Sequence, residues 1–133
     1  MNPTSSTEDY LKAILLEHEV ERGPRIPPGR LAERLGVAPG SVTAMLKSLA
    51  VRALVHYEPY GGVALTPEGQ RIAVAVLRRH RLIELFLVEV LGMDWSEVHA
   101  EAERLEHHVS ERVLSRIDAV LGSPSVDPHG DPI

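Results

Sequence analysis

The sequence predicts a mainly α-helical fold, a winged helix-turn-helix with a small β-hairpin wing followed by an all-helical lobe. Three observations predict it. Two short helix-like segments flank Gly36-Val37-Ala38, two strand-like runs follow them, and a long amphipathic segment starts at Pro67. A hairpin directly after a helix-turn-helix is typical of a wing. Apolar residues make up 44% of the 133 residues, which is enough for a packed core.

Residues that typically start or end helices and strands divide the first lobe, residues 1–72, into its expected elements. Polar residues cap helices, proline opens them, and glycine closes them. The turn cluster at 59–62 separates two runs with strand-like composition. The expected elements are a helix from Ser6 or Thr7 to Gly23-Pro24, helices starting at Pro28 and Pro39 with Gly36 between them, and strands at 54–58 and 63–66.

The second lobe, taken as residues 73–121, is expected to be entirely helical. The helix that starts at Pro67 continues to about Gly92. Asp94 or Ser96 caps a fifth helix that runs to about His107, and Ser110 caps a sixth. Residues 122–133 are rich in proline and are expected to form an irregular tail.

Charge is unevenly distributed along the chain. The net charge is −5, yet residues 25–81 carry nine basic and three acidic side chains, a net of +6. Residues 82–133 carry three basic and eleven acidic side chains, a net of −8. A basic middle suits a polyanion, and an acidic end suits cations or a solvated surface. No segment predicts a membrane span or a signal peptide, so we expect a cytoplasmic protein with no membrane partner.

The third predicted helix carries small and hydroxylated side chains near its start. In helix-turn-helix proteins this part of the helix enters the major groove of DNA. Small residues permit close approach, Ser and Thr can contact phosphates or bases, and Lys47 and Arg52 suit phosphates. The expected DNA-binding residues are Arg30, Pro39, Gly40, Ser41, Thr43, Ala44, Lys47, Tyr57 and Tyr60.

Histidines and glutamates recur at helical spacing in the second lobe. The chain has no cysteine, so any metal ion must be bound by nitrogen and oxygen. Spacings of four, seven and eight residues place side chains on one face of a helix. Six candidate ligands follow on two helices, His99, Glu103, Glu106 and His107 on the fifth and His80 and Glu84 on the fourth. A solvated acidic face is the alternative interpretation of this pattern.

Several segments resemble the diphtheria toxin repressor and manganese transport regulator family of metal-dependent repressors. They are STEDYLKAI, RLAERLGVAPGSVTAMLKSL, LVHYEPYGGVALTPEG, RRHRLIELFL and VHAEAERLEHHVS, which together span nearly the whole chain. The resemblance implies a metal-activated repressor that controls metal homeostasis and binds a palindromic DNA operator as a homodimer. Residues 1–72 would be the DNA-binding domain, and residues 73–121 would bind metal and dimerise.

The resemblance also implies two ligand sets. The primary site would comprise Asp9, Glu103, Glu106 and His107, and the ancillary site His80, Glu84 and His99. Iron-type members carry Met and Cys at the positions of Asp9 and Glu103, so the resemblance is to the manganese type. Carboxylate ligands agree with Mn²⁺, with Fe²⁺ or another divalent transition metal as the alternative.

Two positions depart from the pattern of the longer manganese-type members. Lys12 stands where some of them have a Glu that builds a binuclear cluster, and a charged lysine cannot ligate. Longer members also continue past DPHGDPI into an SH3-like domain, so the tail either leads to such a domain or ends a naturally short form.

Two other functions are compatible with parts of the pattern. The first is a metal-independent winged-helix regulator that senses a small molecule or no ligand. A metallohydrolase using His80, His99, Glu103 and His107 is disfavoured, because no Ser or Cys nucleophile is placed nearby. We therefore expect no enzymatic activity.

Overall fold

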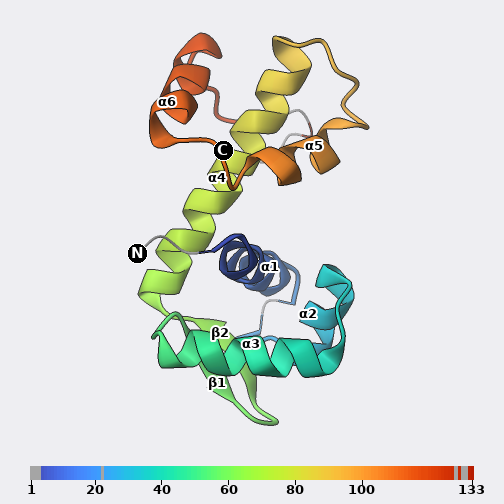
Figure 1. Ribbon diagram of the computed structural model, residues 1–133, viewed down its shortest axis with the longest axis vertical. Coiled ribbons are helices and arrows are strands. Elements are labelled where there is room, and N and C mark those ends of the chain that lie inside the picture. The colour runs from blue at the N-terminus through green and yellow to red at the C-terminus, as the bar shows by residue number, and fades with distance from the viewer. Residues whose placement is uncertain (1–3, 22, 128, 130–131) are drawn as a thin grey trace. The chain divides into compact units, whose positions relative to one another are not determined.

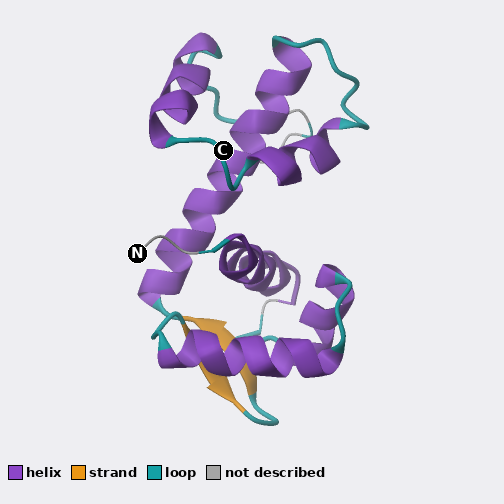
Figure 2. Ribbon diagram, in the orientation of Figure 1, coloured by secondary structure: helices purple, strands orange, loops and turns teal. Residues whose placement is uncertain are grey.

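The computed structural model describes residues 4–21, 23–127, 129 and 132–133. The chain divides after Val74 into two compact units, Met1–Val74 and Ala75–Ile133. The described residues form six helices and one two-stranded antiparallel sheet, which confirms the predicted fold class. Figure 2 shows that most of the described chain is helical. Within that part of the chain, no helix combines the length and hydropathy needed to cross a membrane.

The first unit is a winged helix-turn-helix (Figure 1). It contains α1 (Ser5–Glu21), α2 (Pro28–Leu35), α3 (Pro39–Val51), β1 (Val55–Glu58), β2 (Gly62–Leu65) and the start of α4 (Pro67–Glu89). Helix α2 packs against α1 and α3, and the two strands pack against α3 and α1 respectively. Gly36 closes α2 with φ of 66°, a conformation that glycine adopts without steric cost.

Aliphatic side chains fill the core of this unit. Seven of its largest side chains are almost completely buried, Leu11, Ile14, Ile26, Leu31, Val42, Leu46 and Leu49. Few aromatic residues are available, so the close packing depends on the shapes of branched side chains.

The wing is anchored by a short bridge that the sequence did not predict. Ile26 N donates to Val63 O at 2.8 Å, and Val63 N donates to Ile26 O at 3.0 Å. The hairpin is in register from Val55 opposite Leu65 to Glu58 opposite Gly62. At Gly62, with φ of +89°, a β-carbon would lie 2.9 Å from Ile26 O, so only glycine fits this close approach.

The second unit contains the remainder of α4, together with α5 (Val98–Leu105) and α6 (Glu111–Val120). Its core cluster comprises Ile83, Leu87, Val98 and Ala102, with Val88, Met93 and Val109 packed against it. These residues come from one face of α4 and from α5 with its flanking segments. The packing therefore fixes α5 against the half of α4 that carries His80 and Glu84.

Two of the predicted helix caps are wrong. Helix α1 already begins at Ser5, before the predicted cap at Ser6 or Thr7, and Thr4 Oγ1 accepts from Thr7 N at 3.2 Å. Asp94 binds the backbone and hydroxyl of Ser96 in a local turn, and α5 begins later, at Val98. Asp and Ser form such turns as readily as caps, so composition alone does not separate the two. The Ser110 cap is confirmed, with Ser110 Oγ accepting from Val113 N.

The fifth helix is also shorter than predicted. It ends at Leu105, whereas the sequence predicted an end near His107. His108 N and Val109 N both donate to Leu105 O, which tightens the chain into a turn before α6. Glu106 and His107 therefore lie in this turn, and the expected single stripe with His99 and Glu103 is broken.

Candidate metal centre and DNA-contact surface

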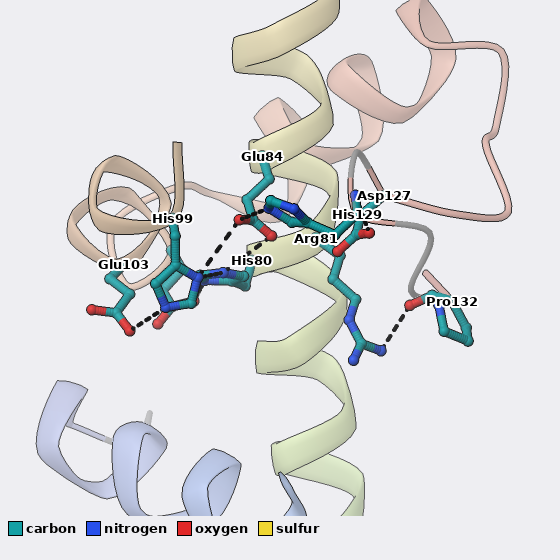
Figure 3. A network of polar contacts seen from close by, with 9 residues as sticks. His80, Arg81, Glu84, His99, Glu103, Asp127, His129 and Pro132 are labelled. Carbon is teal, nitrogen blue, oxygen red and sulfur yellow. Dashed lines mark hydrogen bonds and ion pairs between the residues drawn. The ribbon is translucent and has the colours of Figure 1, made fainter. Parts of the chain in front are cut away.

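The candidate metal centre is built on one turn of α4. His80 and Glu84 are four residues apart and lie on the same face, with His80 Nε2 3.2 Å from Glu84 Oε1. Both side chains are buried. Buried ionisable groups need partners because burial removes their hydration. Here His80 and Glu84 are partners of each other, and His99 and His129 lie close to Glu84 (Figure 3).

Helix α5 adds His99 to this pair. His99 Nδ1 lies 3.1 Å from His80 Nε2 and 3.6 Å from Glu84 Oε2. His80, Glu84 and His99 each offer one ligand atom, and these atoms lie within 4.8 Å of one another. The His99 side chain is 65% exposed, so the group is open to solvent on this side. The structure thus brings together the three residues predicted for the ancillary site.

Glu84 provides the negative charge of the His80–Glu84–His99 group. Burial alone would raise the pKa of Glu84, but the hydrogen bond from His80 and the nearby His80, His129 and His99 lower it below its usual value. The carboxylate therefore stays negative. Its Oε2 atom is buried and accepts no hydrogen bond from the described residues. A buried carboxylate oxygen between imidazole nitrogens is a ligand arrangement that suits a divalent cation.

His129 is a member of this group that the sequence analysis missed. Its Nε2 lies 3.3 Å from Glu84 Oε2, and its backbone N donates to Asp127 Oδ1 at 2.9 Å. The ring also meets Trp95 edge-on, with centroids 5.5 Å apart. Composition alone predicts only an irregular tail for residues 122–133. The one available signal was a histidine close to Asp127 in an acidic region, which is weak by itself.

A second group surrounds Glu106, just after α5. Glu106 is completely buried, and its Oε2 lies 2.8 Å from His80 Nδ1. Its Oε1 lies 3.5 Å from His107 Nε2, and Arg79 Nη1 donates to its carbonyl oxygen at 3.1 Å. Glu106 and His80 were predicted as ligands of different sites. The structure places them in direct contact.

The other two predicted primary ligands are more exposed than Glu106. Glu103 is half exposed, and its Oε1 lies 3.1 Å from His99 Nε2. Asp9 lies on α1 in the first unit and is partly exposed. The division of the seven residues into a primary and an ancillary set stays a prediction.

The predicted DNA-contact residues lie at the surface of the first unit. Pro39, Gly40, Ser41, Ala44 and Lys47 are exposed on α3, as is Arg30 on α2. Thr43 is half-buried, and its hydroxyl donates to Pro39 O at 3.3 Å. On the wing, Tyr60 is fully exposed with φ of 66°, whereas Tyr57 is half-buried. Their role in DNA binding stays a prediction.

Arg52 has a structural partner that weakens its assignment to phosphate. Its Nη1 donates to Thr7 Oγ1 at 3.1 Å, and its Nη2 donates to Ser48 Oγ at 3.3 Å. These bonds tie the end of α3 to α1. Arg52 therefore has a role in holding the helix-turn-helix together.

Comparison with known proteins gives two family matches along the chain. Residues 3–63 match the N-terminal DNA binding domain of iron dependent repressors. Residues 66–133 match the metal binding and dimerisation domain of iron dependent repressors. The first match ends within β2 and the second begins just before α4, so each half of the chain is matched separately.

Individual relatives agree with these matches. The chain is 40% identical over 129 residues to the iron-dependent repressor IdeR of Mycobacterium tuberculosis, covering 96% of this chain and 55% of that protein. It is 37% identical to the HTH-type transcriptional regulator MntR of Listeria welshimeri, covering 90% of this chain and 82% of that protein.

A solved manganese-dependent transcriptional repressor in complex with manganese superposes with a TM-score of 0.86. It is 47% identical to this chain and covers 96% of it, while the chain spans 57% of that protein. The chain thus spans little more than half the length of IdeR and of this repressor. These matches, over both halves of the sequence, show that the chain belongs to the iron dependent repressor family of transcriptional regulators.

Proposed function

We propose that this protein is a transcriptional repressor that binds its DNA operator when a divalent metal ion is bound. The observation that carries the proposal is the buried Glu84 Oε2 atom, which accepts no hydrogen bond in the described chain and lies near His99 and His129. It occurs in the half of the chain that matches a metal binding domain. Members of this family are transcriptional regulators and not enzymes, so the metallohydrolase interpretation is abandoned.

The donor set fits a divalent transition metal. His80, His99 and His129 offer imidazole nitrogens, and Glu84 offers a carboxylate. When bound, the ion would supply positive charge that neutralises the carboxylates and fixes the directions of the imidazoles. We propose His129 as a further ligand of the predicted ancillary set of His80, Glu84 and His99.

We propose a second ion at the predicted primary set. Glu106 and His107 support it because Glu106 Oε1 already lies 3.5 Å from His107 Nε2 in a buried position. The resemblance to the metal-dependent repressor family adds Glu103 and Asp9 to this set. Their carboxylates favour Mn²⁺ as the physiological ion, with Fe²⁺ as the alternative, because hard oxygen ligands remove the advantage that sulfur gives to softer metals. Relatives named for manganese and for iron are both similar to this chain.

DNA recognition is assigned to the first unit. We propose that the start of α3 enters the major groove of a palindromic operator, where Ser41 reads base edges and Lys47 contacts a phosphate. Both side chains are exposed. Because the target is chromosomal DNA, we expect the protein to act in the cytoplasm.

A homodimer would present two such helices to the two half-sites of the operator. A candidate dimer face lies on α6, where an open hollow of about 320 Å³ is lined by Phe86, Arg112, Val113, Arg116, Ile117 and Val120. Val113 and Val120 are 49% and 62% exposed, which is unusual for two apolar side chains on one helix face. Burial of this face against a second copy would remove them from water.

The deciding experiment measures operator binding with Mn²⁺, with Fe²⁺ under anaerobic conditions, and with excess chelator. We expect tight binding with at least one ion and a loss of about 100-fold in the chelator, within the range of allosteric coupling energies. Equal affinity in Mn²⁺ and in chelator would favour the metal-independent winged-helix regulator. The comparison of the two ions decides which one activates the protein.

A further inference from the structure

The two nitrogens of His80 face two different carboxylates. Nε2 lies 3.2 Å from Glu84 Oε1 and 3.1 Å from His99 Nδ1, whereas Nδ1 lies 2.8 Å from Glu106 Oε2. The His80 side chain is only 5% exposed, so packing holds the ring in place. One ring thus connects the His80–Glu84–His99 group to the Glu106–His107 group.

The chemistry of imidazole gives the two ring nitrogens of His80 different roles. A neutral imidazole has one N–H, and a ring nitrogen that binds a metal ion uses its lone pair and cannot carry the proton. If Nε2 binds an ion, the proton must be on Nδ1, where it is donated to Glu106. If the proton is on Nε2 instead, the Nδ1 lone pair faces the Glu106 carboxylate, and the two repel each other.

Two residues of α4 hold Glu106 in position. Arg79 Nη1 donates to its carbonyl oxygen at 3.1 Å, and His80 Nδ1 lies against its carboxylate. The other carboxylate oxygen lies 3.5 Å from His107 Nε2. A hydrogen bond from His80 to Oε2 therefore selects the rotamer that presents Oε1 beside His107.

We infer that His80 is a positioning residue that couples the two proposed ion sites. An ion at His80, Glu84 and His99 fixes the proton on His80 Nδ1, which then donates to the Glu106 carboxylate. This hydrogen bond prepares Glu106 and His107 for the second ion. The coupling is reciprocal, so filling either site raises the affinity of the other. This inference rests on the proposed function, since it requires an ion at each site. It adds to that function a mutual coupling in which an ion at either site raises the affinity of the other site.

The test uses Mn²⁺ titrations of the full chain, with free Mn²⁺ followed by its electron paramagnetic resonance signal and heats by calorimetry. Glu84→Gln removes the carboxylate ligand of the first site and leaves the His80–Glu106 contact, so the one remaining ion reports on Glu106 and His107. We expect that ion to bind about 5-fold or more weakly than the second ion of the unmodified protein, a typical coupling.

Substitutions of His80 in the Glu84→Gln background isolate the hydrogen bond. His80→Ala should weaken the remaining ion by about 10- to 100-fold, the usual cost of removing a group that orients a metal ligand. His80→Asn, whose amide nitrogen lies near the Nδ1 position, should recover most of this loss, whereas His80→Gln should not. His108→Ala is the matched control, because His108 is exposed and adjacent to the site, and it should change nothing.

The outcomes separate this inference from the proposed function. Suppose that the unmodified protein binds two ions, but His80→Ala does not weaken the remaining ion in the Glu84→Gln background. This result would overturn the coupling and leave the proposed function intact. Equal weakening by His80→Ala and His80→Asn, in variants with native circular dichroism, would also overturn it. Absence of Mn²⁺ binding by the unmodified protein would overturn both.

Discussion

The two units place their functional residues in opposite surroundings. The candidate DNA-contact residues of the first unit lie at the surface of one short helix and the wing, close together in sequence. The candidate ligands of the second unit are mostly buried, and they come from α4, from α5 and the turn after it, and from His129 near the C-terminus. A surface that reads DNA must stay accessible, whereas a metal centre gains strength when water is excluded.

This difference sets the scale of the expected mutational effects. Loss of a buried ligand leaves other buried polar groups without a partner, which costs more than the loss of an exposed contact. Substitutions of buried ligands in the metal centre should therefore have large effects on metal-activated DNA binding. Substitutions on the DNA-contact surface should have small effects on DNA affinity.

Asp9→Ala should have the largest effect on DNA binding. Asp9 is the one predicted primary ligand in the first unit, so its ligation would link the state of the metal centre to the DNA-binding unit. We expect metal activation of operator binding to fall by about 100-fold while Mn²⁺ affinity falls less. Parallel Mn²⁺ and operator titrations measure the two effects. Glu19→Ala, an exposed acidic residue on the same helix, is the control and should behave like the unmodified protein.

Asp9→Met extends this test to selectivity. A thioether is softer than a carboxylate, so the variant should shift preference away from Mn²⁺ towards Fe²⁺, Co²⁺ or Ni²⁺. Glu103 stays in place, so we expect a partial shift. If Asp9→Ala keeps full Mn²⁺-activated DNA binding, Asp9 is an ordinary helix-start residue stabilised by the helix dipole.

His107→Ala should weaken metal activation strongly, though less than Asp9→Ala, and leave a folded protein. The His107 side chain is 9% exposed and lies beside Glu106. We expect Mn²⁺ affinity at this site to fall by at least about 10-fold, comparable to other changes around metal centres. Circular dichroism and size-exclusion chromatography should show native helix content and an unchanged oligomeric state. Full retention of Mn²⁺-dependent DNA binding would remove His107 from the site.

The first unit was predictable from sequence almost throughout. Pro28, Gly36 and Pro39 mark helix boundaries because proline and glycine have strict backbone requirements. Helix α2 begins and ends, and α3 begins, where these residues predict. The wing was equally clear, since a turn cluster separates two short apolar runs. The bridge at Ile26 was not predictable, because a single pair of backbone hydrogen bonds leaves no pattern in composition.

The metal centre was predictable only in part. Residue type and spacing identified His80 and Glu84, whose contact is fixed by one turn of α4. The stripe on α5 failed beyond Leu105, because helical spacing holds only while the helix continues and the turn before Ser110 interrupts it. His129 and the contact between Glu106 and His80 depend on tertiary packing between distant segments, which periodicity cannot reveal.

Lys47→Ala should weaken operator binding moderately and uniformly. The side chain is exposed on α3, so the loss should be about fivefold, the scale of an exposed charge. The slope of log affinity against log salt should fall by about 0.9, which corresponds to one phosphate contact. Changes at Ser41 should instead alter sequence preference. Arg104→Ala, an exposed arginine in the acidic unit, is the control, and an unchanged salt slope for Lys47→Ala would contradict the phosphate contact.

The smallest effect is expected for His129→Ala. Its ring is 31% exposed, and Glu84 keeps its contact with His80 when the ring is removed. The free energy of unfolding should therefore change little, since a partly exposed side chain contributes little packing. Mn²⁺ affinity at the His80–Glu84–His99 group should nevertheless fall several-fold, because Glu84 Oε2 loses a neighbouring nitrogen donor. Trp95 packs edge-on against this ring, so its fluorescence reports Mn²⁺ binding in the unmodified protein and should lose that response in the variant. An unchanged affinity together with an unchanged Trp95 response would exclude His129 from the ligand set and restrict the centre to the residues of α4 and α5.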